Sequence, residues 1–546
     1  MASSNSNPLQ RLFQLIALEK DEIKSVYFYA ILSGLVQLSV PIGVQAIIGF
    51  VLGAAMVTSL FVLIFLVVVG VALVGIFQIN QMKIIEKIQQ RIFTRYAFDF
   101  AEKIPRFDLK QADNIYLPEI INRFFDTLNL QKGLSKLLLD IPTASIQIVF
   151  GLLLLSLYHP FFIAFGFLLI VILWIILSYS SKKGLTTSYK ESSYKYAVVS
   201  WLEEMARVLK SFKFSQGSHL NVQRTDKHVL GYLNSRTAHF KVLLVQYRTL
   251  VIFKVLITAG MLSVGTYLLL DQQLNIGEFI AAEIVILTVI AAVEKLISSL
   301  DSIYDVITGL EKLATVTENP LEKSGNIALN TDNQGIAIDF IDFNFQYDNG
   351  QKVFEHFNMT IHKNTIACIK GKAGAGKSSL LKILSGSYSD FTGQLLLNHI
   401  PIGNYQLESL RTQTGVYLNN QDIFIGTLWE NISMGRSSIL PENIIKTAQK
   451  LGIEDFILGF PNGFDSEIDP MGKRLSSTVI KKILLLRALT NDPKLILLEE
   501  PWRGFDDKTT QNIIHFLIEK KKNSTIVVVS NDDDFAKKCD NTVELF

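Results

Sequence analysis

One glycine-rich run constrains the fold of this chain more than any other feature: Gly371-Lys372-Ala373-Gly374-Ala375-Gly376-Lys377-Ser378. It matches the pattern G-x-x-x-x-G-K-[ST] of a phosphate-binding loop. The apolar residues 366–369 enter the loop like a buried strand, and residues 379–384 leave it with helical spacing. In this setting backbone N–H groups at a helix N-terminus can surround phosphate oxygens. The alternative, a glycine-rich turn that contains Lys-Ser by chance, would need neither the strand before it nor the helix after it. The run therefore predicts a phosphate site in an α/β domain.

Long apolar runs fill the first part of the chain. Hydrophobic residues make up 49% of the 546 residues, more than is usual for a soluble protein of this size. The alternative is that some of these runs are buried helices of a large soluble protein. Several runs of about 20 residues each, the length that crosses a bilayer, argue against this alternative. We expect six membrane spans, at residues 26–52, 57–80, 136–158, 161–181, 248–270 and 277–298.

The charges in the connecting segments orient these spans. Residues 81–136 and 182–248 are rich in Lys and Arg, whereas the short turns near 53–57, 158–160 and 271–276 contain neither. By the positive-inside rule the long segments are cytoplasmic, and so are the N-terminus and the phosphate loop. We expect the inner membrane as the location.

The two long cytoplasmic segments have a helical pattern. They predict membrane helices that continue into the cytoplasm and turn near residues 117–125 and 208–216. Such arms would carry motion from a soluble motor to the membrane; the alternative is a set of amphipathic surface helices.

Three charged residues lie inside the apolar runs: Lys254 in the fifth span, and Glu283 and Glu294 in the sixth. Charges within a membrane are costly and usually face a partner or a cavity. Lys254 and Glu294 should lie at similar depth, so we expect them to pair or to line a translocation path. Both readings remain open.

Overall charge and cysteine content exclude several other classes. The 52 basic and 50 acidic residues leave a net charge of +2, which gives no reason to expect a nucleic-acid partner. The two cysteines, Cys368 and Cys539, predict neither a disulfide framework nor a zinc cluster. The N-terminal residues do not have the pattern of a cleaved signal peptide.

The second half of the chain has the pattern of an α/β domain. An alternating stretch at residues 336–347 predicts strands with one exposed face, and apolar strand-like runs recur at residues 366–369, 394–397, 414–418, 495–498 and 525–529. Helical segments separate these runs, which predicts a largely parallel sheet. We therefore expect four regions: a cytoplasmic segment 1–25, a six-helix membrane domain 26–316 with long cytoplasmic extensions, a linker 317–335, and an α/β phosphate-loop domain 336–546.

This order of elements resembles the ATP-binding cassette (ABC) transporters. Residues 410–432 resemble the loop that carries the family's glutamine, 470–489 the signature region, 495–501 the second acidic strand, and 525–531 the switch strand. The resemblance implies Mg²⁺ and ATP as cofactors, with Tyr347 stacked on adenine and Asp506 in the loop after the acidic strand. It also implies that the phosphates lie on Gly371, Lys372, Ala373, Gly374, Ala375, Gly376, Lys377, Ser378 and Ser379.

The chain departs from the family pattern at four places. Asn419 stands where the family has glutamine, Glu499 where it has aspartate, and Asn531 where it has the switch histidine. The signature Leu-Ser-Gly-Gly-Gln is replaced here by a run without glycine: Leu475-Ser476-Ser477-Thr478-Val479.

Each departure has a physical consequence. Ser477 and Thr478 add bulk where the signature glycines allow a helix N-terminus to approach a phosphate. Asn531 donates a hydrogen bond but carries no charge. Loss of one preorganised group typically costs about 10²–10³ in rate, and the losses need not add.

Five residues of the family pattern are retained: Tyr347, Lys377, Ser378, Glu500 and Asp506. Glu500 stands where the family's general base polarises water, and Ser378, Asn419 and Glu499 would hold Mg²⁺. We therefore expect tight Mg-ATP binding with weak turnover, so that the chain is an ATPase with impaired hydrolysis. The alternative for these substitutions is neutral drift in a working enzyme.

The fusion of membrane and motor parts in one chain fits an exporter better than an importer. Residues 35–52 are similar to the first span of type I secretion and peptide exporters. About 25 residues precede the first expected span at 26–52, so no N-terminal peptidase-like domain is expected. The resemblance implies a dimer in the bilayer, a periplasmic adaptor and an outer-membrane channel.

Three functional readings remain open. The first is a homodimeric exporter of a protein, peptide or amphipathic cargo; the second is the degenerate half of a heterodimeric exporter. The third is an ATP-binding membrane scaffold that does not pump. A partner chain with intact motifs would favour the second reading, and an adaptor would disfavour the third.

Overall fold

A computed structural model describes residues 8–53, 58–113, 116–215, 219–469 and 475–546. The chain divides into two compact units. The first comprises Met1–Pro105 and Tyr116–Asn319; the second comprises Arg106–Ile115 and Pro320–Phe546. The short segment Arg106–Ile115 therefore belongs to the second unit, although it lies in sequence within the first.

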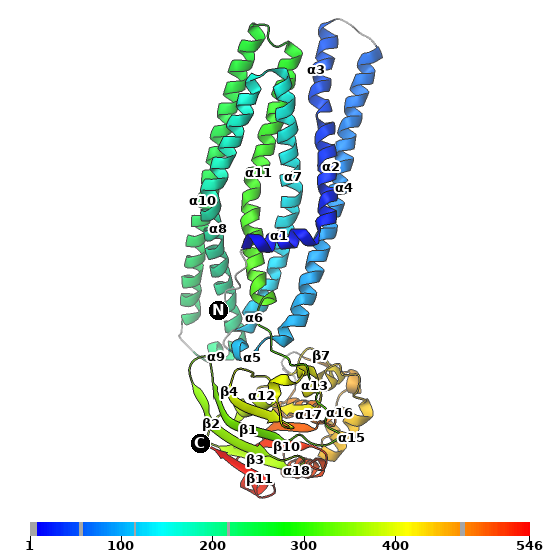
Figure 1. The fold of residues 1–546 in the computed structure, drawn as a ribbon, viewed down its shortest axis with the longest axis vertical. Helices are drawn as coiled ribbons and strands as arrows, with labels where there is room; N and C mark the ends of the chain where they lie inside the picture. The colour runs from blue at the N-terminus through cyan, green and yellow to red at the C-terminus, as the bar shows by residue number, and fades with distance from the viewer. Residues whose placement is uncertain (1–7, 54–57, 114–115, 216–218, 470–474) are drawn as a thin grey trace. The chain divides into compact units, whose positions relative to one another are not determined.

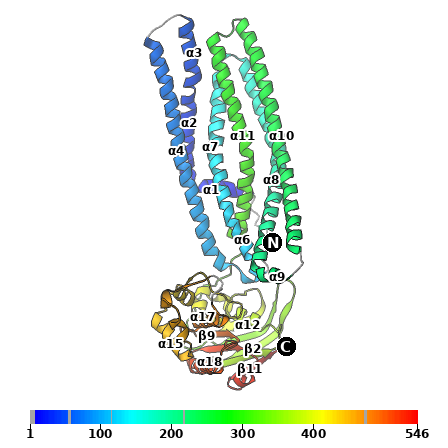
Figure 2. The same cartoon turned by 180° about the vertical axis from the view of Figure 1, so that it is seen from behind.

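The first unit is built from helices. The longest helices lie alongside one another, with α2 beside α4, α8 beside α10 and α7 beside α11. The short helix α1 lies across them (Figures 1 and 2). The helices are α1 Pro8–Leu18, α2 Lys20–Gln37, α3 Ser39–Leu52, α4 Thr58–Lys103, α6 Leu117–Ile121, α7 Asp126–Tyr158, α8 Phe161–Arg207, α9 Leu209–Phe214, α10 Leu220–Leu270 and α11 Ile276–Thr317.

Five helical stretches among the described residues are long and apolar enough to cross a membrane. They are Lys20–Leu52, Thr58–Arg106, Leu117–Tyr158, Leu220–Leu270 and Ile276–Thr317. The fourth span expected from sequence begins α8, where a shorter apolar stretch, Phe161–Ile175, is found. The side chains just beyond it lie outside the described residues, so the count of six spans stays a prediction.

A break at Leu38 divides the first expected span into α2 and α3. Pro41 follows three residues later and has no N–H to donate to the carbonyl of Gln37. Its ring also clashes with that carbonyl in a continuous helix. Proline therefore accounts for a boundary that the apolar pattern alone did not predict.

The first turn between the long helices begins before the predicted tip at residues 117–125. The helix α4 ends at Lys103, and a 3₁₀ turn Ile104–Arg106 and the helix α5 Leu109–Ala112 come before α6. A second 3₁₀ turn, Asn122–Phe125, leads into α7. In the second predicted tip, α9 follows Val208 directly, and residue 216 lies outside the described residues.

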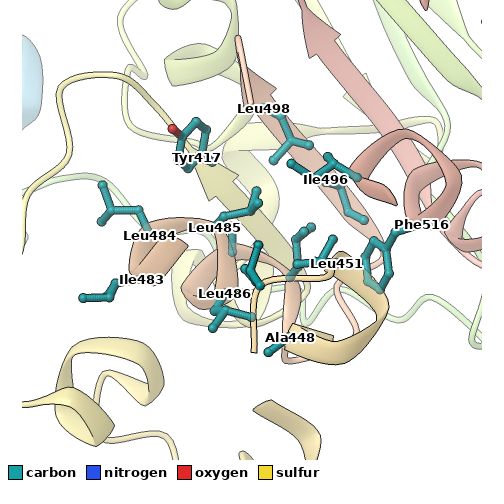
Figure 3. Close-up of a cluster of buried hydrophobic side chains, with 14 of the residues drawn as sticks. Tyr417, Ala448, Leu451, Ile483, Leu484, Leu485, Leu486, Ile496, Leu498 and Phe516 are labelled. Carbon is teal, nitrogen blue, oxygen red and sulfur yellow. The ribbon is translucent and has the colours of Figure 1, made fainter. Parts of the chain in front are cut away.

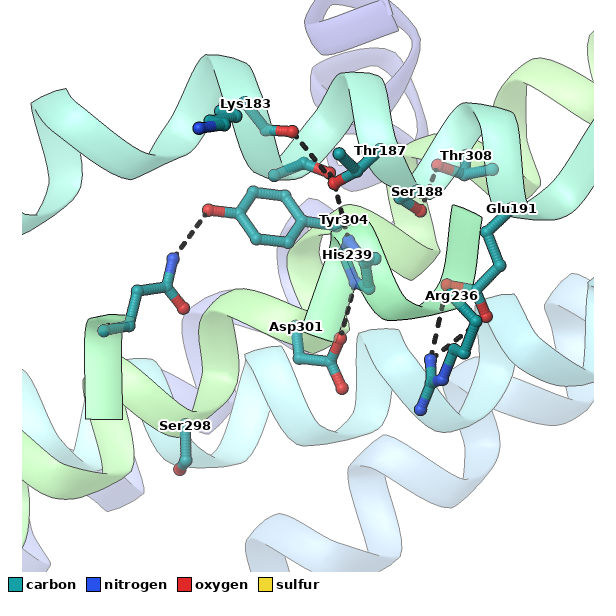
Figure 4. A network of polar contacts seen from close by, with 12 residues as sticks. Lys183, Thr187, Ser188, Glu191, Arg236, His239, Ser298, Asp301, Tyr304 and Thr308 are labelled. Atoms are coloured by element: carbon teal, nitrogen blue, oxygen red, sulfur yellow. Dashed lines mark hydrogen bonds and ion pairs between the residues drawn. The ribbon is translucent and has the colours of Figure 1, made fainter. Parts of the chain in front are cut away.

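A buried polar network joins α8, α10 and α11 (Figure 4). The ring of His239, only 1% exposed, lies between the Thr187 hydroxyl at 2.9 Å and the Asp301 carboxylate at 3.2 Å. The Tyr304 hydroxyl accepts a hydrogen bond from Gln246 over 3.1 Å. Because buried polar groups are costly when unpaired, this network stabilises one register of the three helices.

Two sheets form the centre of the second unit. A parallel sheet has the order β11-β3-β10-β9-β6, and an antiparallel sheet has the order β2-β1-β4-β5. The strands are β1 Ile338–Gln346, β2 Lys352–Ile361, β3 Ile366–Gly371, β4 Thr392–Leu397, β5 Ile400–Pro401, β6 Thr414–Tyr417, β9 Leu495–Glu499, β10 Thr525–Val529 and β11 Asn541–Leu545.

This topology corrects one prediction. The run at residues 394–397 belongs to β4 in the antiparallel sheet, because it pairs with β1 instead of joining the parallel core. The strands β2 and β11 were not predicted. Both carry charged or exposed residues at several positions, so neither reads as an apolar run.

Short helices surround these sheets. They are α12 Lys377–Leu384, α13 Leu407–Thr412, α14 Leu428–Ser433, α15 Pro441–Leu451, α16 Asp455–Leu458, α17 Ser477–Leu489, α18 Asp507–Lys520 and α19 Asp533–Ala536; the small pair β7 Gly426–Thr427 and β8 Glu467–Ile468 completes the unit.

The parallel strands β3, β6, β9 and β10 are buried on both faces. Alternate residues of β9 enter different cores: Ile496 and Leu498 pack with α17 and α18, whereas Leu495 and Leu497 pack in the core that contains α12 and the antiparallel sheet. Figure 3 shows the first core, in which side chains of α17 lie against β9 and β6. Burial on both faces explains why these strands read as continuous apolar runs.

Candidate functional site

The phosphate-loop residues form a turn between β3 and α12. Gly374 and Gly376 have φ angles of 87° and 85°, a region that residues with a Cβ rarely adopt. A Cβ on Gly376 would also lie 2.5 Å from the side chain of Val353. Glycine is therefore required at position 376 for both conformation and space.

The Lys377 side chain folds back over this loop. Its ammonium group donates hydrogen bonds to the backbone oxygens of Gly371, at 2.5 Å, and Lys372, at 2.7 Å. These contacts hold a positive charge above the N-terminus of α12, where the helix dipole also favours an anion. Loop and helix together make an anion site.

Glu499 joins two segments that are distant in sequence. One carboxylate oxygen accepts a hydrogen bond from the Ser378 hydroxyl, and the other accepts one from the Asn419 backbone N–H over 3.0 Å. The hydroxyl and carboxylate oxygens gathered here are the ligands that Mg²⁺ prefers. The donor set at this point therefore fits the metal ion that the sequence predicts, because Ser378 and Glu499 would supply a hydroxyl and a carboxylate oxygen. Coordination by Asn419 stays a prediction.

Glu500 and Asn531 lie at the ends of neighbouring strands. The backbone N–H of Glu500 donates to Val529 over 2.9 Å, and its carboxylate is 3.4 Å from the Ser530 hydroxyl. Its φ angle of 45° is unusual for a residue with a side chain. The amide oxygen of Asn531 accepts a hydrogen bond from the Gly371 N–H over 3.2 Å, so the switch position contacts the phosphate loop itself.

These groups surround one cavity of about 470 Å³. Eleven of the residues that the sequence predicts line it: Tyr347, Ala373, Gly374, Gly376, Lys377, Ser378, Ser379, Asn419, Glu499, Glu500 and Asn531. Four further lining residues were not predicted: Gln351, Val353, Arg503 and Val529. Of these four, only Arg503 could have been suspected from the sequence, because it lies three residues after Glu500 and three before Asp506.

Tyr347 lies at the side of this cavity in an aromatic cluster. Its hydroxyl is 2.6 Å from the Ser379 hydroxyl, and its ring packs edge-on against Phe345 and Tyr388. The cluster places an aromatic side chain beside the phosphate loop, as an adenine platform requires. Stacking on adenine stays a prediction.

Other predicted residues lie outside the cavity. Asp506 caps α18, accepting hydrogen bonds from the backbone and hydroxyl of Thr509, and the backbone bond holds the pKa of Asp506 below its usual value. Ser476 caps α17, and Ser477 is exposed beside it. Pro470 and the four residues after it lie outside the described residues.

The charged residues of the membrane-type helices lie in the other unit. Lys254 and Glu294 form an ion pair between α10 and α11. Glu283 is half-buried on α11, and no ion pair of its carboxylate is found within the described residues. A role for any of the three in a translocation path stays a prediction.

The segment Arg106–Ile115 forms an ionic contact within the second unit that the sequence did not predict. The Lys110 side chain, 8% exposed, lies 2.7 Å from the Asp390 carboxylate and 3.3 Å from that of Asp348. The buried Tyr388 donates its hydroxyl to Asp113, and burial, followed by this carboxylate, raises the pKa of Tyr388. Because Tyr388 also packs against Tyr347, the segment is connected to the cavity wall through Tyr388.

Tyr388→Phe tests this contact. Removing a buried hydroxyl that bonds a charged group is expected to lower the free energy of unfolding by about 1–2 kcal/mol. Asp113→Asn is the partner variant, and a double-mutant cycle by thermal unfolding should give a coupling energy of about 1 kcal/mol. Additive effects of the two changes would show that this hydrogen bond does not form.

Comparisons with known proteins agree with this geometry. Residues 354–503 match the family model described as ABC transporter. A stretch of 315 residues is 26% identical to the alpha-hemolysin translocation ATP-binding protein HlyB of Escherichia coli O157:H7, covering 58% of this chain and 44% of that protein. A stretch of 240 residues is 28% identical to the ATP-dependent lipid A-core flippase of Legionella pneumophila (strain Lens), covering 44% of this chain and 41% of that one.

The matched stretches span less than half the length of these two relatives. The fold is similar over a much larger share. A solved structure of a bacterial Atm1-family ABC exporter with ATP bound has a TM-score of 0.86 to this chain at 15% identity, covering 97% of this chain and 94% of that one. Residues 354–503 therefore form an ABC transporter domain, and the chain as a whole, in which a unit of long apolar helices is joined to this domain, has a fold similar to that of the ABC exporter.

Proposed function

We propose that this chain is one half of an ABC exporter that binds Mg-ATP in the described cavity and couples it to export of a protein, peptide or amphipathic cargo. The observation that carries the proposal is the convergence of Lys377, Ser378, Glu499 and Glu500 on one cavity. A cation, a hydroxyl and two carboxylates beside a helix N-terminus are what a metal–triphosphate requires.

Each residue has a distinct part in this reaction. Lys377 and the loop N–H groups bind the phosphates, while Ser378 and Glu499 would hold Mg²⁺, which would supply positive charge to the phosphate oxygens. Glu500 orients the attacking water and takes its proton. The backbone contact of Glu500 with Val529 fixes the start of its side chain at the edge of the cavity.

Slow hydrolysis is part of the proposal. Asn531 brings no positive charge to the terminal phosphate, and its amide oxygen already accepts a hydrogen bond from the phosphate loop. Glu499 is one methylene longer than the family's aspartate. Both changes act on groups that must be preorganised for the chemical step, so the rate falls more than the binding.

A second subunit belongs to the proposal. Ser476 and Ser477 at the start of α17 are exposed and do not line the cavity of their own chain. The start of α17 is therefore available to complete the site of another copy or of a different half-transporter. We place the dimer in the inner membrane with its nucleotide-binding domains in the cytoplasm; an adaptor and an outer channel are extensions of the same proposal.

The first experiment is Mg-ATP hydrolysis by the purified chain in lipid, compared with Glu500→Gln. We expect a slow turnover that falls by at least about 10²-fold in the variant, because the general base is lost. Binding of Mg-ATP should be unchanged, which calorimetry would check. Turnover that is equal in both proteins would contradict the assignment of Glu500, and absence of turnover in both would favour the heterodimer or the scaffold.

A further inference from the structure

Arg503 brings a second cation to the nucleotide cavity. Among the residues lining this cavity, the ionisable cations are Lys377 and Arg503, and the carboxylates are Glu499 and Glu500. Arg503 is exposed, and within the described part of the chain its guanidinium has no hydrogen-bond or ion-pair partner. It is therefore available to a ligand.

The backbone around Arg503 is held in place. Its N–H donates to the Glu500 carbonyl over 3.1 Å, and its own carbonyl accepts a hydrogen bond of 2.6 Å from Lys481 on α17. The preceding Trp502 is buried, with its ring 4.6 Å from that of Phe535. Gly504 then continues the turn with a φ angle of 89°. These contacts keep Arg503 at the edge of the cavity and not in a free loop.

The chemistry of a guanidinium suits a terminal phosphate. Its planar donors bind two phosphate oxygens at once and stay charged at any physiological pH. Lys377 already donates to two backbone oxygens of its own loop. Asn531 contributes no charge, so Arg503 is the one other positive side chain among the described residues that line the cavity.

We propose that Arg503 is a further phosphate-binding residue of this cavity, and that it makes the site prefer a nucleoside triphosphate to a diphosphate. The inference rests on the proposed function, since it requires a nucleotide in this cavity. A triphosphate is one phosphate longer than a diphosphate and carries one more negative charge in total, so a cation at the cavity edge stabilises the longer chain more.

Calorimetric titration of the full-length protein in lipid nanodiscs tests this inference. The probes are Mg-ADP and the non-hydrolysable analogue Mg-AMPPNP. Arg503→Ala is expected to raise the Kd for Mg-AMPPNP about tenfold and that for Mg-ADP less than about twofold. Arg503→Lys keeps the charge without the planar donors and should lie between. Lys508→Ala removes an equal charge from an exposed position on α18 and is the matched control.

The outcomes separate the inference from the proposed function. If Arg503→Ala binds both nucleotides as Lys508→Ala does, or loses both equally at an unchanged melting temperature, the inference is wrong and the nucleotide site stands. If the unaltered protein binds neither nucleotide, both are overturned. A selective loss for Mg-AMPPNP, partly rescued by Arg503→Lys, supports the inference.

Discussion

Lys377→Ala is expected to weaken Mg-ATP binding by about 100-fold. The ammonium group lies above the N-terminus of α12 and donates to two backbone oxygens of the phosphate loop. On binding, these donors would turn to phosphate oxygens, and charge-assisted hydrogen bonds are each worth about 1.5–3 kcal/mol. Calorimetry with a non-hydrolysable ATP analogue measures the effect directly.

Lys372→Ala is the matched control for this prediction. Lys372 lies in the same loop and carries the same charge, but it is exposed and does not line the cavity. Its loss is expected to change the Kd by no more than about threefold, through a screened long-range charge effect. Equal losses in the two variants would indicate that net charge, and not the position of Lys377, determines binding.

Gly415→Ala is expected to lower the free energy of unfolding of the nucleotide-binding domain by about 3 kcal/mol or more. A Cβ at this buried position on β6 would lie 2.0 Å from the backbone oxygen of Ala488 and 2.8 Å from the ring of Pro493. Overpacking typically costs about 1–3 kcal/mol, and here the close atom is backbone at the end of α17, which moves less easily than a side chain. Differential scanning calorimetry of the full-length protein would record the lower transition.

Gly403→Ala is the corresponding control. No atom lies within 4 Å of a Cβ built on Gly403, so the change should stay within about 0.5 kcal/mol. Displacement of β6 by Gly415→Ala should also shift Glu499 in the nucleotide site, because β6 pairs with β9, which carries Glu499. A melting profile unchanged by Gly415→Ala would mean that α17 does not pack on β6 as described.

The sequence predictions were most accurate for features that depend on neighbouring residues, and least accurate for features that depend on residues far apart in the chain. The strand, loop and helix around Lys377 were predicted correctly, because glycine conformation and apolar periodicity act within a few residues. The division at Leu38 was missed because the apolar pattern continues across it, although Pro41 was a local signal. The run at residues 394–397 was placed in the wrong sheet, since an apolar strand pattern does not reveal its neighbour.

The segment Arg106–Ile115 shows a further limit. Pro105 was a local signal for the end of the helix before it, but the first turn was predicted later in the chain, near residues 117–125. The contacts of the segment are made by Lys110 and Asp113 with residues more than 200 positions away. A single charged residue in a polar loop does not indicate which distant residue it will contact.

By itself, the sequence determined a phosphate loop beside a helix, a set of apolar runs of membrane length, and the residue types of the site, because each depends on neighbouring residues. The tertiary structure decided which of those residues meet. Glu499 reaches Ser378 across 121 positions, and Asn531 reaches Gly371 across 160. It also brought Arg503 to the same cavity, since the parallel order of β3, β10 and β9 places the ends of these strands along one edge of the sheet.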